Sequence, residues 1–244
     1  MRARRADGVQ VAATKSSITD VVTEADRASE ALILERILAA RPDDGMLGEE
    51  GSDRTGTSGV RWVVDPIDGT VNYFLGLPQY AVSIGVEVDG RVEAGVVVNA
   101  ATGDEFTAVR GRGAAHNGRP LRVREARPLA LSVISTGFNY DPAIRARQAT
   151  AVAELLGHVA DIRRFGSCAL DLCAIAAGQS DGYVEEGCNP WDHAAGGLIA
   201  EEAGAVVQIL GGASGRDLVV AAPGPAYPDF LALVRSCGFT ANEG

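Results

Sequence analysis

Cysteine is scarce in this chain of 244 residues, and its four cysteines form no C-x-x-C pair and no other paired metal-ligand spacing. We therefore expect reduced thiols rather than a disulfide framework or a zinc site. No apolar run reaches the roughly 18 residues that a membrane-spanning helix needs. Arg2, Arg4 and Arg5 are not followed by an apolar segment, which argues against a signal peptide. These absences predict a cytoplasmic protein with no membrane partner.

Positive charge is also in short supply, because 22 Lys and Arg residues face 32 Asp and Glu residues. The formal net charge of −10 argues against direct nucleic-acid binding through a basic surface. The sequence contains no G-x-S-x-G elbow and no Ser/His/Asp order, which argues against acyl hydrolysis. An acidic protein repels a phosphorylated substrate unless bound cations reverse the local field. The charge balance therefore fits a site that works only when it holds cations.

The stretch from residue 62 to residue 73 carries the densest set of candidate site residues. Residues 62–64 are branched or aromatic, which predicts a short buried strand with Asp65 at its carboxyl end. Pro66 has no N–H to donate and should stop the strand pairing. Asp68 follows three residues after Asp65, so both carboxylates can turn toward one point. Two crowded carboxylates repel each other, and a bound Mg²⁺ removes that repulsion.

Gly69 and Thr70 come next, at the expected start of a short helix. The unpaired N–H groups and the positive dipole end of a helix suit a phosphate group. A second interpretation is an ordinary surface turn, because Asp, Pro and Gly are common turn residues. Local sequence alone leaves both interpretations open.

The remaining pattern predicts an α/β protein. Glycine, proline and capping residues bound helices at 23–40, 142–157, 167–178, 191–203 and 228–236. Apolar segments predict strands at 80–88, 91–99, 105–109, 121–123, 131–136, 161–163, 182–185, 206–210 and 218–222. Asp89-Gly90 is a strong hairpin signal between two of them. We expect an antiparallel sheet in residues 1–125, a mixed sheet in residues 126–244, and helices between the sheets.

Other acidic residues have both a structural and a functional interpretation. Asp26 can cap the helix that begins at Thr23, or it can lie just outside a metal cluster. Glu49, between glycines, is either in a solvated turn or a partner for Asp65 and Asp68. Asp192 lies in the first turn of a helix, where the dipole already favours negative charge. Further downstream, Gly166-Ser167-Cys168 opens another helix and Glu185 ends a strand that can face the same cavity.

Histidine offers no evident catalytic base. His193 points about 100° away from Asp192 around the helix, so we expect it to pack or to lie at the surface. His116 and His158 show no partner in the sequence.

Taken together, these residues resemble the inositol monophosphatase family of Mg²⁺-dependent, lithium-sensitive phosphatases. The resemblance rests on Gly48-Glu49-Glu50, on the stretch from Asp65 to Tyr73, and on Trp191-Asp192-His193-Ala194-Ala195-Gly196. Residues 15–17, 20–23 and 26 resemble the early motif of the family, and residues 166–173 resemble its substrate loop. The match runs from about Lys15 to near the C-terminus.

The resemblance implies a layered αβαβα fold and phosphomonoester hydrolysis by a homodimer that uses two or three Mg²⁺ ions per site. It assigns one metal to Glu49, Asp65 and the Ile67 carbonyl, and a second metal to Asp65, Asp68 and Asp192. It places Asp26 near a further metal or its waters, and it gives Thr70 and Glu49 the task of orienting the attacking water. It assigns the phosphate to Gly69 and Thr70, and the alcohol to Gly166, Ser167, Cys168 and Glu185.

Two positions depart from the usual family pattern. Cys168 stands where a small residue such as alanine is usual, and Glu186 adds a charge beside Glu185. Both residues can retune the substrate pocket.

The leading substrate is inositol 1-phosphate, because Asn72-Tyr73 and Leu77-Pro78 resemble that branch of the family. Histidinol phosphate, fructose 1,6-bisphosphate and nucleotide 3′-phosphates are alternatives within the same chemistry. A non-enzymatic partner of the transcription machinery is an alternative of a different class.

Overall fold

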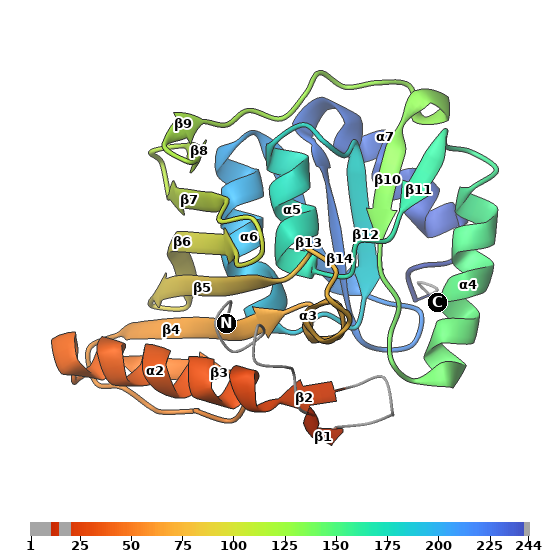
Figure 1. The fold of residues 1–244 in the computed structure, drawn as a ribbon. Coiled ribbons are helices and arrows are strands. Elements are labelled where there is room, and N and C mark those ends of the chain that lie inside the picture. The colour runs from red at the N-terminus through yellow and green to blue at the C-terminus, as the bar shows by residue number, and fades with distance from the viewer. Residues whose placement is uncertain (1–10, 15–20, 242–244) are drawn as a thin grey trace.

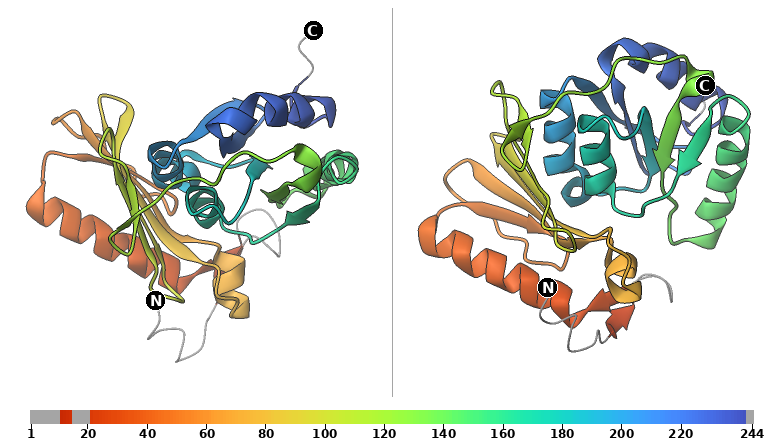
Figure 2. Two further views of the ribbon diagram at one scale, coloured as in Figure 1. Left: turned by 90° about the horizontal axis from the view of Figure 1, so that it is seen from above. Right: turned by 45° about the horizontal axis from the view of Figure 1, so that its top comes forward.

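The fold consists of five alternating layers of helices and sheets (Figure 1). The computed structural model describes residues 11–14 and 21–241. Helix α2 (Glu24–Ala40) covers the outer face of a first sheet, and helices α5 (Cys168–Ala176) and α6 (Pro190–Glu202) lie between this sheet and a second one. Helices α4 (Pro142–Leu155) and α7 (Tyr227–Ser236) cover the far face of the second sheet (Figure 2). The predicted αβαβα arrangement is therefore confirmed.

The first sheet has seven strands in the order β3-β4-β5-β6-β7-β8-β9. Their bounds are β3 (Gly45–Gly48), β4 (Val60–Asp68), β5 (Ala81–Val88), β6 (Arg91–Asn99), β7 (Glu105–Val109), β8 (Ala114–His116) and β9 (Arg119–Pro120). Every neighbouring pair is antiparallel except β3 and β4, which run parallel. The Asp89-Gly90 hairpin is confirmed, since both residues have the positive φ (50° and 81°) that a type I′ turn requires.

One predicted strand, at residues 121–123, is wrong. The pairing ends instead at Pro120, in β9. The N–H of Leu121 donates to Ala114, but the N–H of Val123 donates to Ala203 at the end of α6. Because Leu121 and Val123 bond to different elements, residues 121–123 do not form a continuous ladder with one strand.

The second sheet has five strands in the order β11-β10-β12-β14-β13. Their bounds are β10 (Val133–Thr136), β11 (Asp161–Arg163), β12 (Gly182–Glu186), β13 (Ala205–Gly211) and β14 (Asp217–Pro223). The pairs that involve β10 are parallel and the others are antiparallel, so the predicted mixed sheet is confirmed. Asp141 caps α4 as expected, because its side chain accepts a hydrogen bond from the N–H of Ala143 at 2.8 Å.

Helix α6 approaches the first sheet at backbone-contact distance. A Cβ atom added at Gly95 in β6 would lie 3.0 Å from the Cα of Ala195. A Cβ atom added at Gly85 in β5 would lie 3.1 Å from the Cβ of Ala194. The glycines of the sheet and the alanines of the helix therefore set how closely α6 is seated.

The first elements of the chain agree with the sequence in outline. Strands β1 (Val11–Thr14) and β2 (Val21–Thr23) pair antiparallel, and α2 follows at Glu24, one residue after the expected start. The early motif at residues 15–17 and 20 lies outside the described residues. Ile33, Leu34, Ile37 and Leu38 of α2 are only half-buried, and Leu32 is 53% exposed, because the helix has a sheet on one side only.

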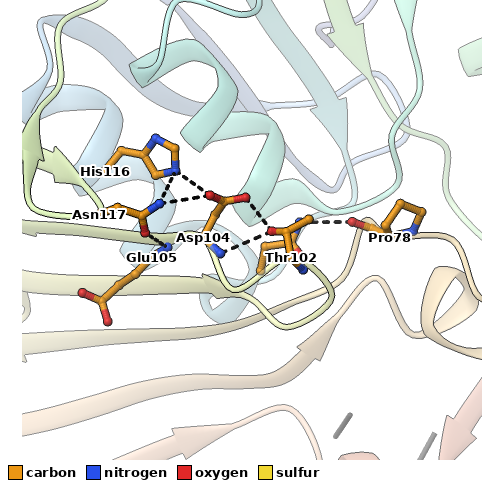
Figure 3. A network of polar contacts seen from close by, with 7 residues as sticks. Pro78, Thr102, Asp104, Glu105, His116 and Asn117 are labelled. Atoms are coloured by element: carbon orange, nitrogen blue, oxygen red, sulfur yellow. Dashed lines mark hydrogen bonds and ion pairs between the residues drawn. The ribbon is translucent and has the colours of Figure 1, made fainter. Parts of the chain in front are cut away.

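Histidine partners that the sequence did not reveal are present. His116 Nε2 lies 2.9 Å from Asp104 Oδ1, beside Asn117, whose side chain also contacts Asp104 (Figure 3). The imidazole ring of His116 stacks on Phe106 with centroids 4.4 Å apart. His158 Nε2 lies 3.4 Å from Glu154. The statement that these histidines have no partner is therefore wrong, and His116 belongs to a turn-stabilising network.

All four cysteines are free and buried, as predicted. None of the helices in the described part of the chain combines the length and apolar character needed to cross a bilayer.

Candidate active site

A bulge in β4 turns two carboxylates toward one another. The strand does not stop at Pro66, as the sequence suggested, but resumes pairing at Asp68. Asp65 pairs with Ser83 and Asp68 pairs with Ala81, so the register shifts between them. Pro66 lies inside this bulge, where its missing N–H leaves no gap in the ladder. Asp65 Oδ1 accepts a hydrogen bond from the N–H of Ile67 at 2.9 Å, which fixes one of its oxygens.

Two carboxylates of β4 and one from the first turn of α6 meet at this bulge. Asp65, Asp68 and Asp192 each offer an oxygen within 4.8 Å of the others. Asp192 lies in the first turn of α6, and its Oδ2 accepts a hydrogen bond from the N–H of Asn189 at 2.6 Å. Asp68 Oδ2 accepts from Ser167 Oγ at 2.6 Å and from the N–H of Ala169 at 2.7 Å. The start of α5 thus holds a carboxylate of the first sheet in place.

Burial and mutual repulsion make it unfavourable for Asp65, Asp68 and Asp192 to be ionised together without a bound cation. Burial, and then the charges of Glu49, Asp68 and Asp192, raise the pKa of Asp65 well above its ordinary value. Burial raises the pKa of Asp68 to about 7, although its hydrogen bonds from Ser167 and Ala169 oppose that rise. Burial, followed by the charge of Asp68, raises the pKa of Asp192. Glu49 also forms a side-chain hydrogen bond with Asp65. Clustered oxygen donors of this kind suit divalent cations such as Mg²⁺.

Thr70 opens α3 (Thr70–Leu75) beside the carboxylates. Its hydroxyl lies 3.0 Å from Asp26 Oδ1 and 2.9 Å from the carbonyl oxygen of Ile67. Asp26 is buried on α2 and is not one of the three clustered carboxylates. Gly69 precedes α3 with φ 91°, and a Cβ atom there would lie 2.7 Å from the carbonyl of Gln79. Glycine is therefore required at this position for both conformation and space.

A cavity of about 450 Å³ opens over these groups. Its wall includes most of the expected site residues: Glu49, Asp65, Ile67, Asp68, Gly69, Thr70, Gly166, Cys168, Glu185 and Asp192. Asp26 and Ser167 are not part of the wall, because Asp26 bonds Thr70 from behind and the Ser167 hydroxyl is directed at Asp68.

Glu185, in β12 of the second sheet, lines the cavity. Tyr183 donates its hydroxyl to Glu185 Oε2 at 2.8 Å, and a side chain at Gly137 would overlap the Glu185 carboxylate. Burial raises the pKa of Glu185, while the Tyr183 hydroxyl and the charge of Arg164 oppose the rise. The Glu185 carboxylate is thus held in one orientation by the Tyr183 hydroxyl and by its close packing against Gly137.

The neighbouring Glu186 has a different environment. Its Oε1 accepts hydrogen bonds from the N–H and the hydroxyl of Ser214, at 2.7 and 2.6 Å. Side chains alternate along a strand, so Glu186 is directed to the turn between β13 and β14 rather than toward Glu185. Its carboxylate ties down that turn.

Glu186 lines the cavity, as the sequence analysis expected. Other residues of the cavity wall were missed by the sequence analysis: Phe138, Asn139, Tyr140, Asp141, Arg164, Gly187, Cys188, Asn189, Trp191 and Arg216. Residues 138–141 follow β10, and loops at the carboxyl ends of parallel strands often carry site residues, so that group had a signal. Arg216 comes from the turn before β14, which no local pattern links to the site.

Comparison with known proteins agrees with this geometry. The model of the inositol monophosphatase family matches residues 1–237. The chain belongs to the inositol monophosphatase family. It is 44% identical over 247 residues to the inositol-1-monophosphatase SuhB of Mycobacterium tuberculosis strain H37Rv, covering 96% of this chain and 85% of that protein. It is also 44% identical over 225 residues to the Nus factor SuhB of Pasteurella multocida, covering 90% of this chain and 84% of that protein.

Solved structures of this family share the fold. The extragenic suppressor protein suhB of Bartonella henselae superposes with a TM-score of 0.84 at 36% identity, covering 98% of this chain and 90% of that one. The inositol monophosphate-bound structure of SaIMPase-II superposes with a TM-score of 0.70 at 29% identity, covering 87% of each chain. Membership of this family supports a phosphatase activity for the chain.

Proposed function

We propose that this protein is a Mg²⁺-dependent phosphomonoesterase that hydrolyses inositol 1-phosphate. The observation that carries the proposal is the convergence of Asp65, Asp68 and Asp192, whose oxygens lie within 4.8 Å of one another. They come from a strand of the first sheet and from the first turn of α6, and a buried acidic cluster of this kind needs cations to remain ionised at neutral pH.

The proposed donors form two sets. Glu49, Asp65 and the Ile67 carbonyl would hold one Mg²⁺ ion, Asp65, Asp68 and Asp192 would hold a second, and a further ion would lie near Asp26. When bound, such cations supply Lewis-acid activation of water and neutralise charge on the phosphate and the leaving oxygen.

Residues of the chain position the reacting groups. The Thr70 hydroxyl has a single proton and two acceptors, and the charged Asp26 is the stronger acceptor. Donation to Asp26 leaves a Thr70 lone pair free to accept a hydrogen bond from the attacking water, and it leaves the Ile67 carbonyl free to bind a cation. Glu49, which interacts with Asp65 and also lines the cavity, orients the same water. Gly69 and Thr70 line the cavity at the start of α3, and their backbone N–H groups would bind the phosphate.

The alcohol part of the substrate fits the wall formed by the second half of the chain. Glu185 accepts hydrogen bonds from sugar or polyol hydroxyls, and Cys168 and Gly166 provide the adjacent surface. Ser167 acts through Asp68, which it bonds directly. The inositol monophosphate bound to SaIMPase-II supports a phosphorylated polyol as the ligand class.

A panel of phosphomonoesters tests the proposal. Phosphate release is measured from inositol 1-phosphate, histidinol phosphate, fructose 1,6-bisphosphate and a nucleotide 3′-phosphate, with and without Mg²⁺, followed by a lithium titration. We expect Mg²⁺-dependent, lithium-inhibited release that is fastest from inositol 1-phosphate. Equal or faster turnover of another member of the panel overturns the substrate assignment.

A role in transcription is the second candidate, because relatives at 40% identity or more carry the name Nus factor SuhB. Asp65→Asn separates the two functions. A phosphatase loses its metal-dependent turnover, whereas a protein that acts only by binding partner proteins keeps that binding. We further propose that the active form is a homodimer, which light scattering in solution tests.

A further inference from the structure

A buried carboxylate on α2 is bonded to the turn that carries Glu49. The side chain belongs to Glu30, which is only 2% exposed. Its Oε2 accepts a hydrogen bond from the N–H of Glu50 at 2.9 Å. Its Oε1 accepts one from the N–H of Ser52 at 3.0 Å and another from the Ser52 hydroxyl. Burying a carboxylate is costly unless donors replace the lost water, and the turn after β3 supplies these donors.

Two anchored N–H groups flank the α-carbon of Glu49. Its own N–H donates to the carbonyl of Val64 at 3.2 Å, in the strand that continues to Asp65. The next N–H along the chain, that of Glu50, donates to Glu30. A residue has only two soft backbone dihedrals, so fixing the N–H groups on both sides restricts the direction in which the Glu49 side chain leaves the backbone. Glu49 and Asp65 line the same cavity, so this direction decides whether both can reach one cation.

Gly48 leaves the space that the Glu30 carboxylate occupies. A Cβ atom added at Gly48 would lie 2.6 Å from Glu30 Oε2 and 2.8 Å from the carboxyl carbon of Glu30. Gly48 does not adopt the left-handed conformation, so space rather than backbone conformation favours glycine here. The glycine that precedes Glu49 is thus explained by a carboxylate from another element.

We propose that Glu30 is a positioning residue for the metal site, which holds Glu49 in the orientation needed to bind a divalent cation. This inference rests on the proposed function, because it takes Glu49 as a Mg²⁺ ligand. Glu30 is not part of the cavity wall, so it acts through the turn and touches neither the cation nor the substrate.

The number of donors explains why a carboxylate is needed at this position. Three hydrogens from the turn are shared between the two oxygens of Glu30. A glutamine has one acceptor oxygen and an amide group that donates, so it can keep the Glu50 contact or the Ser52 contacts, but not both. Either choice leaves an N–H of the turn without its acceptor. Residues that orient a metal ligand in this way typically contribute about 10- to 100-fold to metal affinity.

The test measures Mg²⁺ binding to the metal-free, full-length protein by calorimetry, which needs no turnover. We expect Glu30→Gln to weaken Mg²⁺ binding by about tenfold. Glu202→Gln is the matched control, because Glu202 also holds a turn through two backbone N–H groups. Those groups belong to Gly111 and Gly113, at 2.8 Å each, and Glu202 lies at the opposite end of α6 from Asp192. Mg²⁺ affinity should stay within about twofold in this control.

A double-mutant cycle shows whether the effect passes through Glu49. Once Glu49→Gln has removed the positioned carboxylate, adding Glu30→Gln should change Mg²⁺ affinity by less than about twofold. A merely structural role for Glu30 gives the same tenfold loss in both backgrounds. In turnover assays, Glu30→Gln should raise the Mg²⁺ concentration for half-maximal rate about tenfold and leave KM for inositol 1-phosphate within about twofold.

Ser52→Ala provides a second variant in case Glu30→Gln does not fold. It removes one of the three donors, so we expect Mg²⁺ binding to weaken by about threefold while thermal unfolding stays cooperative.

Unchanged Mg²⁺ affinity in the folded variant, or additive losses in the cycle, overturn the inference. A lack of Mg²⁺ binding by the unmodified protein overturns both the proposed function and this inference, whereas Mg²⁺ binding that Glu30→Gln leaves unchanged overturns this inference alone. Should the unmodified protein bind Mg²⁺ but hydrolyse no phosphomonoester, calorimetry still decides the role of Glu30.

Discussion

Thr70 donates its hydroxyl to Asp26 across 44 residues of sequence, at 3.0 Å, and the same hydroxyl lies 2.9 Å from the Ile67 carbonyl. This contact joins α2 to the start of α3 at the edge of the carboxylate cluster. Because the Thr70 hydroxyl donates its proton to Asp26, its oxygen can still accept a hydrogen bond from a molecule in the cavity that Thr70 lines. Asp26 thus contributes to the site through Thr70.

Thr70→Ala should lower kcat for inositol 1-phosphate by about 10²- to 10³-fold, because the group that positions the attacking water is removed. Thr70→Ser is the matched control: it keeps the hydroxyl and should retain most of the activity. Asp26→Asn should give a smaller loss, and the double variant should lose no more than Thr70→Ala alone. Strictly additive losses in kcat would show that the two residues act separately.

Ser167→Ala should weaken Mg²⁺ binding by about tenfold, because it removes the 2.6 Å hydrogen bond that orients Asp68. The hydroxyl also caps α5 through the N–H of Leu170, so a stability loss of about 1 kcal/mol is expected in addition. Ser167→Thr keeps both contacts and controls for the substitution itself. Mg²⁺ titration of turnover gives the measurement, and an unchanged Mg²⁺ dependence in Ser167→Ala contradicts the prediction.

Without metal, the protein should become less stable as the pH rises from about 4 to about 7. Asp65, Asp68 and Asp192 have pKa values raised in the folded state, so the folded protein binds more protons than the unfolded chain over this range. Their stabilising contribution is complete below the ordinary pKa of about 4 and is lost as the pH passes through about 7, the value for Asp68.

Thermal unfolding in a chelator measures this effect, and we expect Tm to fall by several degrees between pH 5 and pH 8. Asp68→Asn should flatten the profile, and saturating Mg²⁺ should raise Tm most at the higher pH. A profile that Asp68→Asn leaves unchanged would exclude Asp68 as a source of the pH dependence.

Tyr183→Phe should raise KM for inositol 1-phosphate by about tenfold and leave kcat within about twofold, because it removes the hydrogen bond that orients Glu185. Hydrolysis of p-nitrophenyl phosphate, which has no polyol hydroxyls, should keep its KM. Tyr227→Phe is a matched control, since it removes a hydroxyl contact to Gln208 of similar length, 2.9 Å. Equal effects on both substrates would assign Tyr183 a purely structural role.

The sequence predicted the local elements of the fold well where each residue has one strong preference. Asp89-Gly90 needs positive φ at both positions, and Asp141-Pro142 combines a cap with a fixed φ, so a hairpin and a helix start were predictable there. The bulge in β4 was not, because Pro66 reads as a stop unless the pairing on both sides of it is known. Residues 121–123 failed for the same reason: their alternating pattern is genuine, but Leu121 bonds to β8 whereas Val123 bonds to the end of α6.

In the candidate site, the residues with suitable side chains were easier to predict from the sequence than the contacts between them. Asp65 and Asp68 are three residues apart in the sequence, and their crowding was foreseeable from that spacing. The meeting of Asp68 with Ser167 depends on how the two sheets pack, which no local pattern encodes.

The close seating of α6 on Gly85 and Gly95 has a consequence for mutational tolerance. Asp192 lies on α6, and the distance between α6 and the first sheet is set by glycine and alanine residues that have no functional groups. A methyl group added at Gly95 in β6 would push α6 away from the sheet and would shift Asp192, a proposed metal ligand, relative to Asp65 and Asp68. The least replaceable positions of this protein therefore include two that have no chemistry of their own, and a search for function by reactive side chains would pass over them.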